Sequence, residues 1–203
     1  MAKAVRDIDR GYARIIRTLA ELKGKEIAVG LQAGDVHKES GMDVARLGAI
    51  HEFGATINVE ARTQTIYHKI SKGGAFAKGG RFVKAKRSNF ARDVSIGAHS
   101  IVIPARPFVR RTFDEKHGDW HAKAQDQIGQ VIDGRKDLPA ALATIGNVME
   151  RDIKAKIADG PFIPNAPSTI RRKKSARPLI DSGHMRQSVR YVVRRRGSGR
   201  LIT

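Results

Sequence analysis

Cysteine is absent from this chain of 203 residues, which excludes disulfide bonds, thiol catalysis and cysteine-based zinc sites. Aromatic residues make up only 5% of the sequence and include a single tryptophan, so we expect a mainly aliphatic core. No stretch approaches the roughly 20 apolar residues of a membrane-spanning helix. The first seven residues carry no apolar signal-peptide segment. These absences predict a folded protein made in a cytoplasm, and the length favours one domain.

Acidic residues are scarce relative to basic ones, with 20 Asp and Glu against 39 Lys and Arg, which gives a net charge of +19. The excess is local. Residues 62–92 contain nine basic side chains and no acid, and residues 171–200 contain eleven against Asp181 alone. Solubility does not require acid-free windows of this length, so the distribution favours contact with a polyanion, most commonly nucleic acid. The alternative is a solvated basic surface that serves only solubility.

Hydrophobic spacing predicts helices and strands along most of the chain. Helices are expected at 5–22, between Ser40 and Gly54, at 107–132, between Asp137 and Gly160, and at 168–174. The second is expected to open with a Ser40–Asp43 capping box, and the fourth to be capped by Asp137. Strands are expected at 25–31, 57–59, 65–70, 81–84, 100–103 and 188–193. These elements predict an α+β fold, with helices packed on a small antiparallel sheet and a long basic β-hairpin insertion.

The hairpin is expected over residues 63–86, with 81–84 as its returning strand and a flexible tip between two glycine pairs. Phe76, Phe82 and Phe90 interleave there with lysine and arginine. Aromatic rings among cations can stack on nucleic-acid bases. Alternation along a hairpin also packs one of its faces, and we favour this packing interpretation.

Catalytic and metal-binding patterns are weak in this sequence, and we expect no enzyme, cofactor or metal site. His117 and His121 have the spacing of a helical metal pair, but the glutamate of the zinc-protease pattern is missing and Gly118 weakens the helix. An exposed polar helix face explains them better. Glu52 is expected to be a surface charge near a helix end. The glycine pairs do not match a phosphate-binding loop, and no established nucleic-acid-binding motif is present.

Three stretches together resemble a family of small tailed-bacteriophage proteins, the virion morphogenesis, tail-completion or head–tail connector proteins. Residues 47–55 (LGAIHEFGA) are similar to the family's "EFG" element, which ends a helix. Residues 103–110 (IPARPFVR) resemble its strand-to-helix elbow, read as "IPARPFLR". Residues 178–189 (PLIDSGHMRQSV) are similar to its C-terminal "PLIDTG.LR.SI" segment. The order and spacing of the three also match the family.

The resemblance implies a non-enzymatic structural subunit at the virion neck. Such a subunit would form a homo-oligomeric ring, expected to be a hexamer, around genomic DNA. Its neighbours would be portal-side connector or adaptor proteins and tail tube or terminator proteins. Shorter members run almost directly from the EFG element to the elbow, so residues 62–92 are an insertion here. We therefore expect a single domain over 1–203, with 62–92 as a basic hairpin arm and 194–203 as a basic C-terminal tail.

Two groups of residues are candidates for functional roles. The structural elbow consists of Pro104, Arg106, Pro107 and Phe108, with Phe108 expected to pack inward. The side chains expected to face DNA or to serve assembly are Lys69, Lys72, Lys78, Arg81, Lys84, Lys86, Arg87, Arg194, Arg195 and Arg196. A stand-alone basic, architectural DNA-binding protein is the main alternative. An enzyme acting on nucleic acid has less support, because the sequence shows no carboxylate cluster for metal ions.

Overall fold

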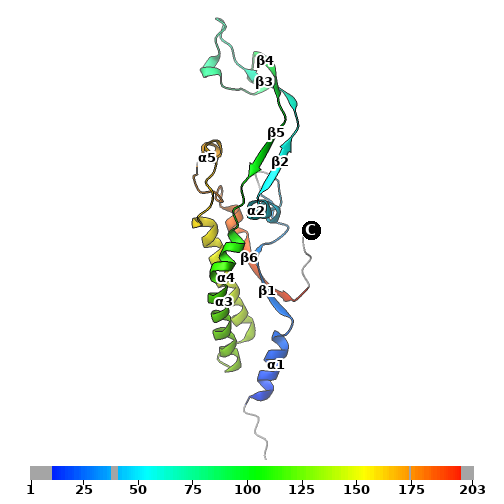
Figure 1. Cartoon of the computed structure of the whole chain (residues 1–203), viewed down its shortest axis with the longest axis vertical. Helices are drawn as coiled ribbons and strands as arrows, with labels where there is room; N and C mark the ends of the chain where they lie inside the picture. Colours follow the sequence, from blue (N-terminus) through cyan, green and yellow to red (C-terminus); the bar gives the residue numbers. More distant parts are fainter. Residues whose placement is uncertain (1–10, 38–40, 174, 198–203) are drawn as a thin grey trace, which may run out of the picture. The chain divides into compact units, whose positions relative to one another are not determined.

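The computed structural model describes residues 11–37, 41–173 and 175–197, without the side chain of Lys78, and it has the predicted α+β class (Figure 1). The chain divides into two compact units. Unit 1 comprises residues 1–54 and 104–203 as far as they are described, and unit 2 comprises 55–103. Outside the described residues lie the start of the first predicted helix, Ser40 of the predicted capping box, Lys174 and residues 198–203 of the predicted tail.

Unit 1 contains six helices and two strands among its described residues. They are α1 (Tyr12–Leu22), β1 (Lys25–Leu31), α2 (Val44–Phe53), α3 (Phe108–Ile132), α4 (Leu138–Asp159), α5 (Pro167–Lys173), α6 (His184–Gln187) and β6 (Val189–Arg195). β1 and β6 pair antiparallel, with Lys25 opposite Arg195 and Leu31 opposite Val189. α4 packs against α3 and also against both strands (Figure 1). α4 therefore connects the helical part of unit 1 with its strands.

Aspartate caps begin two of these helices. The Asp43 carboxylate accepts hydrogen bonds from the backbone N–H groups of Ala45 and Arg46, so Asp43 itself caps α2. Asp137 accepts from Ala140 N–H at 2.7 Å and caps α4, as predicted. α3 runs unbroken through Gly118 and Gly129 because its packing against α4 outweighs their low helix propensity.

Two hydrophobic clusters form the core of unit 1. The larger contains Val44, Phe108, Ile153, Ile157, Leu179, Met185 and Val189. The smaller contains Val131, Leu138, Ala141 and Leu142, with Leu22 and Ile27 packed against it. Gly146 of α4 allows close approach of β6, because a Cβ there would lie 2.3 Å from Cδ2 of Tyr191. The aliphatic character of both clusters agrees with the low aromatic content.

Unit 2 contains four strands, which are β2 (Ala55–Val59), β3 (Arg62–His68), β4 (Phe90–Ile96) and β5 (His99–Ile103). β2 pairs antiparallel with β5, and β3 pairs antiparallel with β4. The predicted register of the hairpin is wrong, because His68 lies opposite Phe90 and residues 81–84 form no strand. Residues 69–89 instead form a loop with two short 3-10 helices, Ala77–Gly80 and Ala85–Arg87. Among all the described residues, no helix is long and apolar enough to cross a membrane.

Candidate functional site

The elbow, residues 104–110 of unit 1, is built around a buried arginine. Arg106 is only 5% exposed. Its Nε donates to the carbonyl oxygen of Ile163 at 2.9 Å, and its terminal nitrogen donates to Asn165 Oδ1 at 3.2 Å and to the Pro164 carbonyl at 3.4 Å. Its backbone N–H donates to the His51 carbonyl at 2.6 Å. Arg106 therefore connects α2, the start of α3 and the loop that follows α4.

No carboxylate forms an ion pair with Arg106 within the described part of the chain. Burial lowers the pKa of its guanidinium, and the charge is held by neutral acceptors alone. Asn165, which is also buried, donates from Nδ2 to the Arg177 carbonyl at 3.4 Å. This network fixes the loop beside the elbow, and it supports a structural role for Arg106.

Glu52 caps the N-terminus of α3 from another helix. Its two carboxylate oxygens accept from the backbone N–H groups of Val109 and Arg110, each at 2.9 Å. Glu52 is only 8% exposed, so the prediction of a surface charge is wrong. Pro107 occupies the cap position of α3 and has no side-chain acceptor, so the orphan N–H groups are satisfied by this distant carboxylate. A contact between residues 57 positions apart leaves no local pattern in the sequence.

The three stretches that carry the family resemblance meet in one place. Glu52 from the EFG element holds the first turn of α3, where the elbow ends. Phe108 of the elbow is 1% exposed, as predicted, and lies in one hydrophobic cluster with Leu179, Met185 and Val189 of the C-terminal segment. Segments far apart in the sequence are thus interlocked by hydrogen bonds and by a shared core.

His51 lies beside this network and is partly buried. Its Nδ1 atom is buried and has no hydrogen-bond partner in the part of the chain that the structure describes. Burial first, and then the charges of Arg106 and Lys173, lower the pKa of His51 from 6.5 to about 4. Burial also lowers the pKa of Lys173, whose Nζ donates to the Pro178 carbonyl at 3.2 Å. His51 is therefore neutral at pH 7 in the folded chain.

We expect His51 to make the folded chain sensitive to acid. The unfolded chain binds a proton at this histidine near pH 6.5, whereas the folded chain binds it only near pH 4. The contribution is therefore present above pH 6.5 and is lost progressively as the pH falls toward 4. The loss amounts to about 3 kcal/mol, at roughly 1.36 kcal/mol per pKa unit. Urea unfolding of the wild type and of His51→Asn between these pH values measures it, and parallel pH profiles would contradict this prediction.

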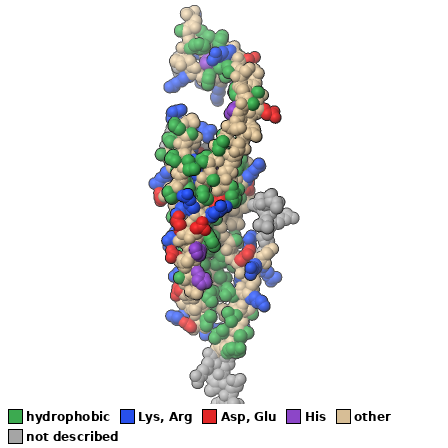
Figure 2. All heavy atoms as spheres, in the orientation of Figure 1, with side chains coloured by type: hydrophobic (Ala, Val, Ile, Leu, Met, Phe, Trp, Pro, Cys, Tyr) green, Lys and Arg blue, Asp and Glu red, His purple; other side chains and the backbone are tan. Residues whose placement is uncertain are grey.

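Unit 2 carries a cluster of positive charge in the loop of residues 69–89, which we call the cationic tip. The side chains of six cations are exposed there: Lys69, Lys72, Arg81, Lys84, Lys86 and Arg87. Within the part of the chain that the structure describes, none of these six forms an ion pair. Figure 2 shows blue cationic and green hydrophobic side chains next to one another in this region. The seventh predicted cation, Lys78, has its side chain outside the described part.

The cationic tip is folded around a buried histidine at the end of β3. His68 is 4% exposed, and its ring centroid lies 4.9 Å from Phe76, 5.1 Å from Phe82 and 6.5 Å from Phe90. The Asn89 amide both accepts from Ile70 N–H and donates to its carbonyl, each at 2.6 Å. These contacts agree with the packing interpretation of the phenylalanines. They give the tip more internal structure than the glycine-flanked turn that the sequence predicted.

The C-terminal arginines lie in unit 1, on and beside a strand. Arg194 and Arg195 belong to β6, so the predicted basic tail begins inside the β1–β6 pair. Arg194 Nε lies 2.6 Å from Glu26 Oε1 and forms an ion pair with it. The Arg196 backbone N–H donates to the Gly24 carbonyl at 2.6 Å. Because the charge of Arg194 is matched locally, the cationic tip is the stronger candidate for contact with a polyanion.

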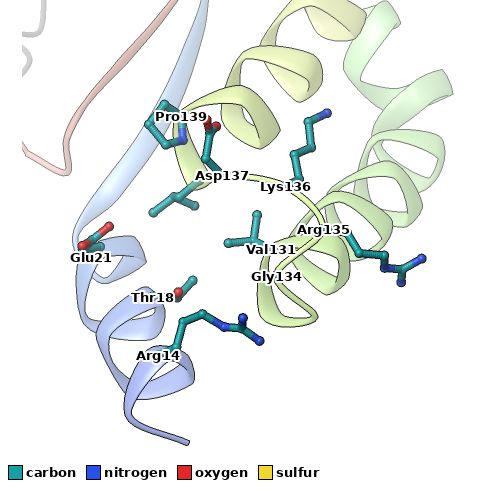
Figure 3. Close-up of a pocket in the computed structure, with 10 residues that line it drawn as sticks. Arg14, Thr18, Glu21, Val131, Gly134, Arg135, Lys136, Asp137 and Pro139 are labelled. Atoms are coloured by element: carbon teal, nitrogen blue, oxygen red, sulfur yellow. The ribbon is translucent and has the colours of Figure 1, made fainter. Parts of the chain in front are cut away.

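A cavity of about 480 Å³ lies between α1 and the turn that joins α3 to α4 (Figure 3). Three of its polar lining residues already serve the fold. Arg14 donates to the Ile132 carbonyl at 3.0 Å, Asp137 caps α4, and Lys136 Nζ donates to Gln127 and Thr144. These three polar groups are therefore already engaged in contacts that hold the fold.

The histidines of α3 show no metal-binding arrangement. His117 and His121 are exposed on α3, and the ring of His117 stacks on Phe113 at 5.5 Å. Nowhere in the described ranges do three or more His, Asp or Glu side chains gather in a group that could hold a metal ion.

Comparison of the chain with protein-family models, with curated proteins and with solved structures gave no match.

Proposed function

We propose that this chain is a structural, non-enzymatic subunit of the head–tail junction of a tailed bacteriophage. In this proposal, copies of the chain form a ring, expected to be a hexamer, in the virion neck. The ring joins portal-side connector or adaptor proteins to tail tube or terminator proteins and surrounds the genomic DNA. The observation that carries the proposal is the convergence of the three resembling stretches on the Arg106 elbow. Chance similarity of three short segments gives no reason for such interlocking.

The charge of unit 2 supports a place beside DNA. It contains nine Lys and Arg residues and only two acids, Glu60 and Asp93, which gives the unit a net charge of +7. Contacts between cations and phosphates release counterions and bind DNA independently of its base sequence. A subunit that surrounds genomic DNA needs binding of this kind. The rest of the chain supplies balanced charge apart from its C-terminal segment.

Exposed apolar side chains on unit 1 support assembly. Ile16 and Leu19 of α1 are 48% and 46% exposed, and Phe53, Phe113 and Ile163 are all more than half exposed. Large apolar side chains grouped on a surface commonly mark interfaces between proteins. In a ring, each subunit uses two different surfaces to contact its two neighbours, which accommodates more than one such patch.

Loss of the chain provides the test of this proposal. If the gene for the chain is interrupted in the phage genome that encodes it, we expect DNA-filled heads and separate tails to accumulate, because the joining ring is missing. Supplying the intact chain from a plasmid should restore tailed particles. Normal numbers of infectious tailed particles without the chain would contradict the proposal.

A stand-alone architectural DNA-binding protein is the second candidate, favoured by the cationic tip alone. Such a protein would bind free duplex tightly at low salt as a small oligomer, and particles would not contain it. Mass spectrometry of purified particles separates the two candidates, because only the junction subunit should be present there in several copies per particle.

A further inference from the structure

The cationic tip exposes aromatic surface that a contact with phosphates alone does not need. Phe82 is 72% exposed and Phe76 is 47% exposed, although both rings touch His68. Arg81 and Lys84 flank Phe82 in the chain, and both are exposed. An accessible aromatic face with cations on either side is the arrangement with which proteins bind single-stranded nucleic acid, stacking a base on the ring and pairing the backbone with the cations.

His68 gives an independent indication of a ligand. Both of its ring nitrogens are buried, and neither has a hydrogen-bond partner among the described residues. Buried polar atoms without partners are rare because leaving them unsatisfied costs free energy. The edge of a nucleic-acid base carries donors and acceptors that could pair with these nitrogens. Phe82 makes an edge contact with the imidazole at 5.1 Å and is the most exposed of the three phenylalanines around it.

The framework beneath Phe82 is already formed in the free chain. Asn89 is hydrogen-bonded to both backbone groups of Ile70, and Ile70 and Phe76 form a β-bridge. The backbone N–H of Val83, next to Phe82, donates to the Tyr67 carbonyl at 2.9 Å. A ligand that binds here does not have to order the loop, which lowers the entropic cost of binding.

We propose that the cationic tip binds single-stranded nucleic acid, with Phe82 as the stacking surface for a base. Duplex DNA presents phosphates but keeps its bases stacked, so it would leave Phe82 unused. An anionic lipid surface would match the cations and the phenylalanines, but its acyl chains offer no partner to the His68 nitrogens. This proposal does not depend on the head–tail function, because it concerns unit 2 alone.

Fluorescence anisotropy with the full chain tests the proposal. The probes are a labelled oligothymidine of about 20 nucleotides, a length that covers one binding site, and a duplex of the same length, both at about 0.1 M salt. We expect the single strand to bind about tenfold more tightly than the duplex. Phe82→Ala should weaken single-strand binding about tenfold, the effect of losing one stacked base, and leave duplex binding unchanged. Phe82→Trp should retain single-strand binding.

Phe113→Ala is the matched control, because Phe113 is a similarly exposed phenylalanine on α3 of unit 1, and it should change neither affinity. Circular dichroism of each variant shows whether the fold is kept. Equal affinity for both probes with no effect of Phe82→Ala would overturn the proposal. Binding to vesicles of phosphatidylglycerol and phosphatidylcholine without binding to the single strand would overturn it as well. Neither outcome would affect the result of the gene-interruption test.

Discussion

Replacement of Arg106 by alanine is expected to lower the free energy of unfolding by about 3 kcal/mol. The variant leaves three acceptors without their donor, namely the buried side chain of Asn165 and the carbonyls of Ile163 and Pro164. Removal of a buried charge recovers part of the desolvation cost. The orphaned acceptors outweigh this gain because no described carboxylate pairs with Arg106, and because the cavity left by the side chain adds a further cost.

Urea unfolding followed by the fluorescence of Trp120 measures this effect. Trp120 is the single tryptophan and is 6% exposed. It lies on α3, and its indole N–H donates to the carboxylate of Asp152 on α4, so its fluorescence reports on the folding of unit 1. Arg110→Ala is the matched control, because Arg110 is exposed and its guanidinium lies over the Phe53 ring, 5.7 Å from its centroid, with no ion pair among the described residues. The control should lose less than about 1 kcal/mol. An Arg106→Ala variant as stable as Arg110→Ala would contradict the structural role of the elbow.

The second large effect is expected on DNA binding. Replacement of Lys84, Lys86 and Arg87 by glutamine should lower the affinity for DNA about 100-fold or more at about 0.1 M salt, because three phosphate contacts and their counterion release are lost. The slope of log affinity against log salt should become shallower by about 3 for the same reason. Folding should be unaffected, since all three side chains are exposed and none forms an ion pair among the described residues.

A second triple variant, with the same change in net charge but outside the cationic tip, shows whether DNA affinity depends on contacts of the tip or on the net charge of the whole chain. Lys116, Lys123 and Arg151 lie on α3 and α4 and are paired with Asp119, Asp126 and Asp152. Their replacement by glutamine should reduce DNA affinity much less than the change in the cationic tip. Equal losses in the two triple variants would mean that binding follows net charge, and the cationic tip would no longer be a specific site.

Elements with regular hydrophobic spacing or a local cap could be predicted from the sequence. The hydrophobic residues at helical spacing from Leu138 to Ile157, together with the Asp137 cap, predicted α4. Residues that favour strands predicted β1 and β6. Pro104 and Pro107 marked the elbow, and Phe108 packs inward as expected. These features depend on residues within a few positions of one another, so one sequence is enough to show them.

Features that depend on long-range contacts could not be predicted. Glu52 looked like a surface charge because its partners, Val109 and Arg110, belong to a helix that starts much later in the chain. The sequence predicts the return of the hairpin at 81–84, but Asn89 and the His68 cluster move the pairing to Phe90. The interleaved phenylalanines did signal the cationic tip, although they did not reveal its buried histidine.

Cryo-electron microscopy of the virion neck tests the central claim most directly. Particles of the phage that encodes the chain would be imaged, and the head–tail junction would be averaged with the symmetry left free. The account predicts a closed ring of this chain, expected to have six copies, between the portal-side proteins and the tail. It also predicts that Lys84, Lys86 and Arg87 of each copy face the DNA path. Absence of the chain from the particle, or its presence there as a single copy outside any ring, would contradict the account.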